Sequence, residues 1–188
     1  SESFFDARRL FPGIRSQVLQ AFDAVKASAV CQGKVEVAAW GANTVRTEFA
    51  FLSGLGPASL GVHRFNPYRK LARTGVPTMA SFLRSLGYRT VCVHPYFASF
   101  YTRDEVFPLL GFDEFIDIES FKDVEKTGPY IGDVALAEKV CALLQKSSNQ
   151  PIFVFVISME NHGPLHLEKV HGDDVARLYS NPPPEGCD

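Results

Sequence analysis

The stretch GANTVRTEFAFLSGL, residues 41–55, places a threonine hydroxyl directly ahead of an apolar segment. Thr44 has two interpretations. It caps an ordinary helix, where threonine is common, or its hydroxyl lies at a helix N-terminus, where unpaired N–H groups and the helix dipole favour a phosphate. Arg46 adds a cation that would hold phosphate or pair with Glu48. The second interpretation would make the chain an enzyme.

Two further segments carry side chains that suit an anionic substrate. HPYFASFYTR begins at His94 and contains Tyr101 and Arg103, and MENHGPLH contains His162. A lone histidine at the end of an apolar strand is more often structural, so His94 has a structural and a functional interpretation. The glycine and proline after His162 disfavour a helical metal pair with the next histidine, and contact with a phosphate or hydroxyl is its better functional use.

Strands are expected immediately before these three segments. One runs from about Val35 to Trp40, and another lies in RTVCVHPY. The continuous apolar run PIFVFVIS is typical of a central strand covered on both faces. DEFIDIES is a further strand candidate.

Helices are expected between the strands. The helical segments are LFPGIRSQVLQAFDAV, TVRTEFAFLSGL, VPTMASFLRSLGY, TRDEVFPLLGF and GDVALAEKVCALLQKS. The second should stop at Gly54 or Gly56, and Thr78 is a possible cap of the third. Residues 57–74 show no clean period and are expected to be loop.

This alternation predicts an α/β fold, a three-layer sandwich around a mostly parallel sheet. In such sheets the chemistry gathers beyond the carboxyl ends of the strands. All three polar segments follow strands, so we expect them to converge on one anionic substrate.

Composition excludes several other classes. The 188 residues fit one domain, and a net charge of −2 gives no support to nucleic-acid binding. No run of about 18 apolar residues is present, so no membrane span is expected in this chain. The four cysteines form no CxxC pair, which disfavours a zinc site.

The segments ESFFD, GANTVRTEFAFLSGL, VHPYFASFYTRDEVFPLLGFDEFID and FVISMENHGP occur in an order that resembles one known family. This is the family of sulfatase-like phosphoglycerol transferases, of the lipoteichoic acid synthase and periplasmic glucan type. It belongs to the alkaline phosphatase superfamily. The resemblance covers nearly the whole chain.

The resemblance implies roles for specific residues. Thr44 resembles the nucleophile, and Glu2 together with Thr44 resembles the ligands of a divalent metal, Mn²⁺ or Mg²⁺. The remaining matches are residues that bind the phosphoglycerol group or lie beside it: Arg46 (a weaker match), His94, Tyr101, Arg103 and His162.

The resemblance also implies an activity and a place in the cell. A phosphoglycerol group would pass from a lipid-linked donor to Thr44, giving a covalent intermediate, and then to a cell-surface or periplasmic glycan. Such enzymes act at the extracytoplasmic face of the bacterial inner membrane or in the periplasm. The full-length protein is therefore expected to be membrane-anchored.

Two departures from the family lead us to expect a fragment. The family's first strand should precede Glu2, and its Asp-His metal pair should follow the NHGP segment at a distance. His171 with Asp173 and Asp174 does not fit that pair in order or setting. Residues 1–188 are therefore expected to be one partial catalytic domain with an incomplete metal site and little activity alone.

Two alternatives stay open. A sulfatase or phosphodiesterase of the same fold is one, although the TVRTE segment has no cysteine or serine in the C/S-x-P-x-R setting of sulfatases. The other is a catalytically inactive module that binds anionic glycans or lipid headgroups. The missing metal ligands favour this module, and the retained Thr44, His94, Arg103 and His162 oppose it.

Overall fold

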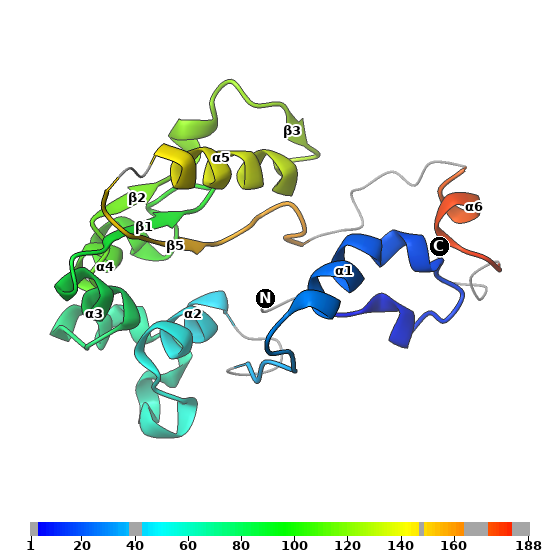
Figure 1. Cartoon of the computed structure of the whole chain (residues 1–188). Coiled ribbons are helices and arrows are strands. Elements are labelled where there is room, and N and C mark those ends of the chain that lie inside the picture. The colour runs from blue at the N-terminus through cyan, green and yellow to red at the C-terminus, as the bar shows by residue number, and fades with distance from the viewer. Residues whose placement is uncertain (1–3, 38–42, 147–148, 164–172, 182–188) are drawn as a thin grey trace. The chain divides into compact units, whose positions relative to one another are not determined.

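A computed structural model describes residues 4–37, 43–146, 149–163 and 173–181 of the chain (Figure 1). The chain divides into two compact units, Ser1–Glu36 with His166–Asp188, and Val37–Leu165. No helix in the described ranges is long and apolar enough to cross a membrane.

The first unit is helical and small. It contains the short 3₁₀ helices η1 (Ala7–Arg9) and η2 (Ser16–Leu19), followed by α1 (Gln20–Ser28) and α6 (Asp174–Leu178). The α-helix expected from Leu10 starts only at Gln20, since Ile14 forms a β-bridge with Tyr179.

The strand expected at Val35–Trp40 is not found in its described part. Val35–Val37 has no regular structure, and residues 38–40 lie outside the described ranges. The alternation in KVEV is too short to make a strand without a hydrogen-bonded neighbour, and none of the described strands pairs with it.

The second unit is built on a parallel sheet. β1 (Arg89–Val93) lies between β2 (Glu114–Ile116) and β5 (Ile152–Val156). The prediction that PIFVFVIS is the central strand is wrong for the described sheet, since β5 is at its edge and half-buried. β1 and β5 come from apolar runs of similar length, and such runs do not reveal which strand is central. The pairing partners decide the strand order. A separate hairpin joins β3 (Lys126–Thr127) to β4 (Tyr130–Ile131).

Helices cover both faces of this sheet, which confirms the predicted α/β three-layer sandwich. Cys92 faces a core formed by α2 (Thr44–Ser53), α3 (Met79–Ser85) and α4 (Arg103–Leu109). On the opposite face Val91 and Val93 pack with Leu136 of α5 (Asp133–Lys146). The alternate side chains of β1 are thus buried in two separate cores.

Two helix boundaries follow the sequence signals. α2 stops at Gly54, which adopts the left-handed conformation with φ 72°. α3 begins with a capping box in which Thr78 and Ser81 each accept from the other's backbone N–H.

The segment expected to be loop is instead a series of short 3₁₀ helices. These are η3 (Pro57–Ser59), η4 (Gly61–Phe65), η5 (Pro67–Arg69) and η6 (Ala72–Thr74). Pro57 and Pro67 each start one of them, where a missing N–H does no harm. Runs this short give no readable period, yet Tyr68 and Ala72 anchor the segment in the core.

Gly111 joins α4 to β2 at a point where no side chain fits. It has φ 96°, and a Cβ there would lie 2.5 Å from the backbone of Ser81. We predict that Gly111→Ala lowers the free energy of unfolding by about 3 kcal/mol or more, because left-handed strain and a backbone clash add.

Gly54→Ala is the matched control, because Gly54 has φ 72° and nothing within 4 Å of its added Cβ. It should lose only about 1 kcal/mol. Urea unfolding of both variants measures the difference. If both variants lost the same free energy of unfolding, the backbone of Ser81 would not be in close contact with Gly111.

Candidate active site

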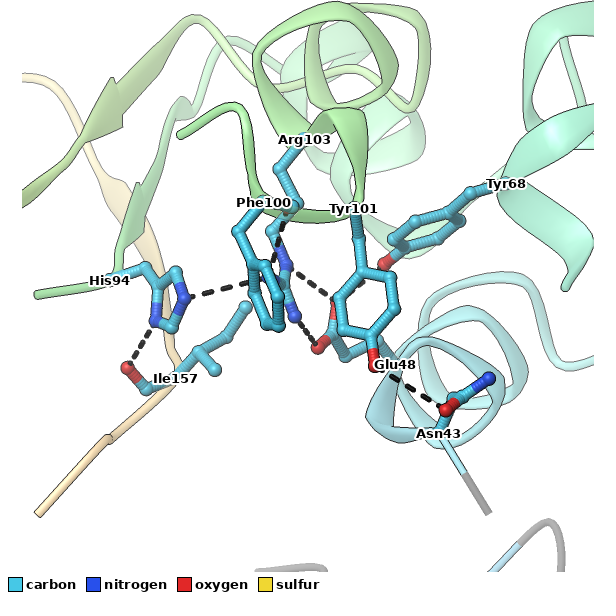
Figure 2. Close-up of polar contacts among 8 residues, drawn as sticks. All are labelled: Asn43, Glu48, Tyr68, His94, Phe100, Tyr101, Arg103 and Ile157. Atoms are coloured by element: carbon cyan, nitrogen blue, oxygen red, sulfur yellow. Dashed lines mark hydrogen bonds and ion pairs between the residues drawn. The ribbon is translucent and has the colours of Figure 1, made fainter. Parts of the chain in front are cut away.

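Asn43, not Thr44, is the N-cap residue of the helix that carries Thr44, and the Asn43 side chain accepts no hydrogen bond from the helix. The interpretation of Thr44 as the cap is therefore wrong, and Thr44 is the first helical residue. Asn43 Oδ1 instead accepts from the hydroxyl of Tyr101 at 3.3 Å (Figure 2). The Asn43 side chain thus accepts from none of the first-turn N–H groups of α2, and the N–H of Arg46 donates to the carbonyl of Asn43. The N–H groups at a helix N-terminus favour an anion.

Tyr101 reaches Asn43 from a strained turn. Tyr101 and Thr102 have φ 59° and 55°, and they are the only described residues other than glycine with positive φ. Such backbone costs about 1 kcal/mol or more at each residue and persists only where surrounding contacts hold it. The turn links η7 (Phe100–Thr102) to α4.

A buried ion pair holds the far end of this turn. Arg103 and Glu48 are 2% and 4% exposed, and the guanidinium meets both carboxylate oxygens at 2.5 and 3.2 Å. The hydroxyl of Tyr68 donates to Glu48 at 2.6 Å, and Arg103 Nη1 donates to the carbonyl of Phe100 at 3.2 Å (Figure 2). The charge of Arg103 is therefore largely offset by Glu48 inside the protein.

His94 is neutral and fixed at the end of β1. Its Nδ1 lies 3.0 Å from the carbonyl of Ile157, which only accepts, so Nδ1 carries the proton. Nε2 faces Arg103 Nη1 at 3.5 Å. Burial, and then the charge of Arg103, lower the pKa of His94 to about 4. The hydrogen bond from His94 Nδ1 to the Ile157 carbonyl and the one from Ile157 N to Val93 O together join the carboxyl ends of β1 and β5.

His162 lies on the exposed loop that follows β5. Its Nδ1 is 3.5 Å from the hydroxyl of Tyr130, and the two rings lie 5.8 Å apart. The carboxylate of Glu160 accepts from the first N–H of α5, at Asp133, and this ties the loop to that helix. Burial and the charge of Glu160 raise the pKa of Asp133.

Arg46 is the cation nearest to Thr44 along α2. Its guanidinium lies 5.6 Å from the centre of the Phe65 ring. Its Nε is buried and has no hydrogen-bond partner within the described ranges. A buried donor without a partner is costly, and an anion at this end of α2 would satisfy it.

The residues implied as metal ligands are only partly described. Glu2 lies outside the described ranges. Within those ranges no group of three or more His, Cys, Asp or Glu side chains could hold a metal ion. Thr44 is thus the one proposed ligand with a known position, and the described side chains alone do not form a metal site.

The structure brings together most of the substrate-binding candidates, but some of them are buried and others are at the surface. Tyr101 contacts Asn43 next to Thr44, whereas His94 and Arg103 are buried in one network. His162 is exposed and contacts Tyr130 instead.

The sequence reasoning overlooked Glu48 and Tyr68 as parts of this network. A signal was present for Glu48. It falls between Val45, Phe49 and Leu52, which form the buried stripe of α2, and a carboxylate on such a stripe requires a partner. For Tyr68 no signal existed, because its segment shows no period.

The family-model comparison matches the Sulfatase family over residues 2–181. The chain therefore belongs to the sulfatase family, a family of enzymes, and the expected membership is confirmed.

Two proteins of Rhizobium meliloti (strain 1021) are similar to it. One is the capsular polysaccharide biosynthesis protein RkpI, 37% identical over 90% of this chain and 32% of its own length. The other is named as a candidate for cyclic beta-1,2-glucan modification, 29% identical over 92% of this chain and 27% of its own length. The chain thus spans about a third of the length of these curated relatives.

Solved structures share the fold. Lipoteichoic acid synthase LtaP from Listeria monocytogenes superposes with a TM-score of 0.69 at 24% identity, over 81% of this chain and 38% of that one. Phosphoglycerol transferase GacH of Streptococcus pyogenes, solved with sn-glycerol-1-phosphate, gives 0.68 at 24% identity, over 86% and 41%. The predicted alkaline-phosphatase/sulfatase-like fold is confirmed.

The buried pair yields a stability prediction. Glu48→Ala leaves Arg103 buried without its counter-charge, and we expect a loss of about 3–5 kcal/mol in the free energy of unfolding. Tyr68→Phe removes one hydrogen bond and keeps the pair, so about 1–2 kcal/mol should be lost. Urea unfolding monitored by circular dichroism gives both values. A loss below about 1 kcal/mol in Glu48→Ala would contradict the paired arrangement.

His94 yields a pH prediction. Its pKa falls from 6.5 to about 4 on folding. The contribution of His94 to the free energy of unfolding is therefore full above pH 6.5 and is lost as the pH falls toward 4. The contribution amounts to about 3 kcal/mol. His94→Asn keeps an N–H for Ile157 but does not titrate.

The variant should be less stable at pH 7, and the gap to wild type should narrow between about pH 6.5 and 4. Urea unfolding at a series of pH values measures this gap. A gap that stays constant across the window would show that His94 is protonated in the folded protein.

Proposed function

We propose that the chain is part of a phosphoglycerol transferase that moves a phosphoglycerol group from a lipid donor to a cell-surface or periplasmic glycan. Thr44 is the proposed nucleophile. The observation that carries the proposal is the N-terminus of α2, where Thr44 follows Asn43 and precedes Arg46, and where the Asn43 side chain contacts Tyr101 instead of capping the helix. GacH, a structural neighbour, is a phosphoglycerol transferase solved with sn-glycerol-1-phosphate.

The described side chains define what this site can do. The first-turn N–H groups of α2 and the guanidinium of Arg46 would bind the phosphodiester oxygens and offset their charge. Tyr101 would lie against the glycerol. His94 and Arg103 are buried and would act on the group from within the protein. Arg103 Nη1 is the guanidinium nitrogen that does not bind Glu48, and it faces His94 Nε2. His162 would reach the group from the loop after β5.

The transfer has two steps in this proposal. Thr44 Oγ forms a bond to phosphorus and loses its proton, while the bond to the diacylglycerol oxygen breaks and that oxygen takes a proton. A glycan hydroxyl then attacks phosphorus, loses its proton, and releases Thr44 as a free hydroxyl. Water in place of the glycan would give hydrolysis.

A divalent metal, Mn²⁺ or Mg²⁺, belongs to the proposal through family membership. When bound, such an ion lowers the pKa of a coordinated hydroxyl and offsets phosphate charge. Glu2 and Thr44 are the proposed ligands in this chain. The further ligands would come from a longer protein of which this chain is one portion, which fits a span of about a third of the relatives' length. That protein would be anchored at the extracytoplasmic face of the inner membrane.

Two other functions remain as alternatives. A sulfatase or phosphodiesterase would use the same nucleophile position with water as the acceptor. A binding module for anionic glycans or headgroups would use Arg46 and the N-terminus of α2 without turnover.

Diacylglycerol release tests the proposal. The full-length protein is incubated with a fluorescent phosphatidylglycerol analogue and Mn²⁺. We expect release from wild type, a loss of about a thousandfold or more in Thr44→Ala, and partial retention in Thr44→Ser, because serine keeps a hydroxyl.

Thr127→Ala is the control, since Thr127 is exposed on β3, which Figure 1 shows at the other end of the second unit from α2. Its release should match that of wild type. Equal release from Thr44→Ala and wild type would exclude Thr44 as nucleophile, and no release from wild type would favour the binding module.

A further inference from the structure

The charges of the second unit are unevenly distributed along the chain. Residues 49–103 contain seven Lys and Arg and no Asp or Glu, although the whole chain has a net charge of −2. Four of these cations, Arg64, Arg69, Lys70 and Arg73, fall within residues 54–74, which we call the basic lobe. The lobe consists of η3 to η6, and Figure 1 shows it as the teal turns that project beyond α2.

The basic lobe also exposes apolar side chains. Val62 is 81% exposed and Phe65 58% exposed. The two are three residues apart in η4, and residues at this spacing lie above one another in a 3₁₀ helix. With Pro57, Ala58, Gly61 and Arg64 they line an open hollow of about 330 Å³.

The cations of the basic lobe surround this apolar surface. The guanidinium of Arg64 lies over the Phe65 ring at 4.9 Å, and Arg69 and Lys70 are exposed a few residues further on. Of the four, only Arg73 forms an ion pair among the described residues, with Glu105. Three cations next to exposed apolar groups are therefore available to an external anionic partner.

The basic lobe is fixed in the protein and connected to the candidate site. Tyr68 and Ala72 are buried in the core that α2 helps to form, and Tyr68 also binds Glu48. Phe65 contacts Arg46, which lies in the first turn of α2 after Thr44. A surface bound at the lobe would therefore lie close to the helix end that carries Thr44.

We propose that the basic lobe docks on an anionic phospholipid surface. Val62 and Phe65 would enter the boundary between headgroups and acyl chains, while Arg64, Arg69 and Lys70 would bind the phosphates. Exposed apolar side chains flanked by cations are the features that attract a protein to such a surface. An anionic bilayer fits this charge, because residues 54–74 contain four Lys and Arg and no acidic residue.

This inference goes beyond the proposed transfer, because docking needs no turnover. It would nevertheless explain how a lipid-linked donor reaches Thr44. The two proposals fail separately: Thr44→Ala should abolish transfer and leave vesicle binding unchanged.

Vesicle flotation tests the docking. The whole chain is mixed with phosphatidylcholine vesicles that contain or lack phosphatidylglycerol, and the bound fraction is measured. We expect binding only with phosphatidylglycerol, weakened by salt. Arg64→Gln, Arg69→Gln and Lys70→Gln should each weaken binding about fivefold, and Phe65→Ser or Val62→Ser about tenfold.

Matched variants elsewhere on the same unit are the controls. Phe82 on α3 is 62% exposed, close to the 58% of Phe65, and Lys126 on β3 is an exposed cation. Phe82→Ser and Lys126→Gln should bind as wild type does. Circular dichroism confirms that each variant is folded, and Val62→Ser replaces Phe65→Ser if the latter is not.

Three outcomes would overturn the proposal. The first is equal binding to vesicles with and without phosphatidylglycerol, and the second is no vesicle binding by folded wild type. The latter would leave a protein partner as the occupant of the lobe. The third is an equal loss of binding in Phe82→Ser and Phe65→Ser.

Discussion

The buried pair of Glu48 and Arg103 is the interaction on which the candidate site depends. Removing two charges from water is expensive, and such a pair persists only with good geometry and further hydrogen bonds. Here Tyr68 and the Phe100 carbonyl supply those bonds. The pair links α2 to the start of α4, and it holds the turn whose strained backbone places Tyr101 at the end of α2.

The same pair sets the charge that a substrate would meet. Glu48 offsets the charge of Arg103, and Arg103 with burial keeps His94 neutral. Beside Thr44, positive charge comes from Arg46 and the N-terminus of α2. The neutral imidazole of His94 and the paired guanidinium of Arg103 are both buried and hydrogen-bonded, which fixes their orientation.

The sequence predicted the fold class and most of the helices because periodicity, caps and glycine stops are local signals. Gly54 and Thr78 are examples. It failed where the outcome depends on distant partners. The order of β1 and β5 follows from pairing, and the segment of 3₁₀ helices is anchored by Tyr68 and Ala72, which pack against residues distant in the sequence.

For the candidate site, the sequence indicated which loops carry polar residues but not how they connect. The meeting of His94 with Ile157 follows from the rule that parallel strands end together. The partnership of Arg103 with Glu48 spans 55 positions, and no local pattern encodes it. Glu2 lies outside the described ranges, so its predicted part in the site stays a prediction.

Peptide-resolved hydrogen exchange of Glu48→Gln tests most directly whether the buried pair holds the turn. The informative amides are those of Phe100, Thr102 and Asp104, which donate to carbonyls within residues 97–99. We predict that these amides exchange at least about tenfold faster in the variant, while those of α5 are unchanged. Unchanged exchange throughout residues 97–104 would show that the turn holds its shape without the pair, and would contradict this role for Glu48.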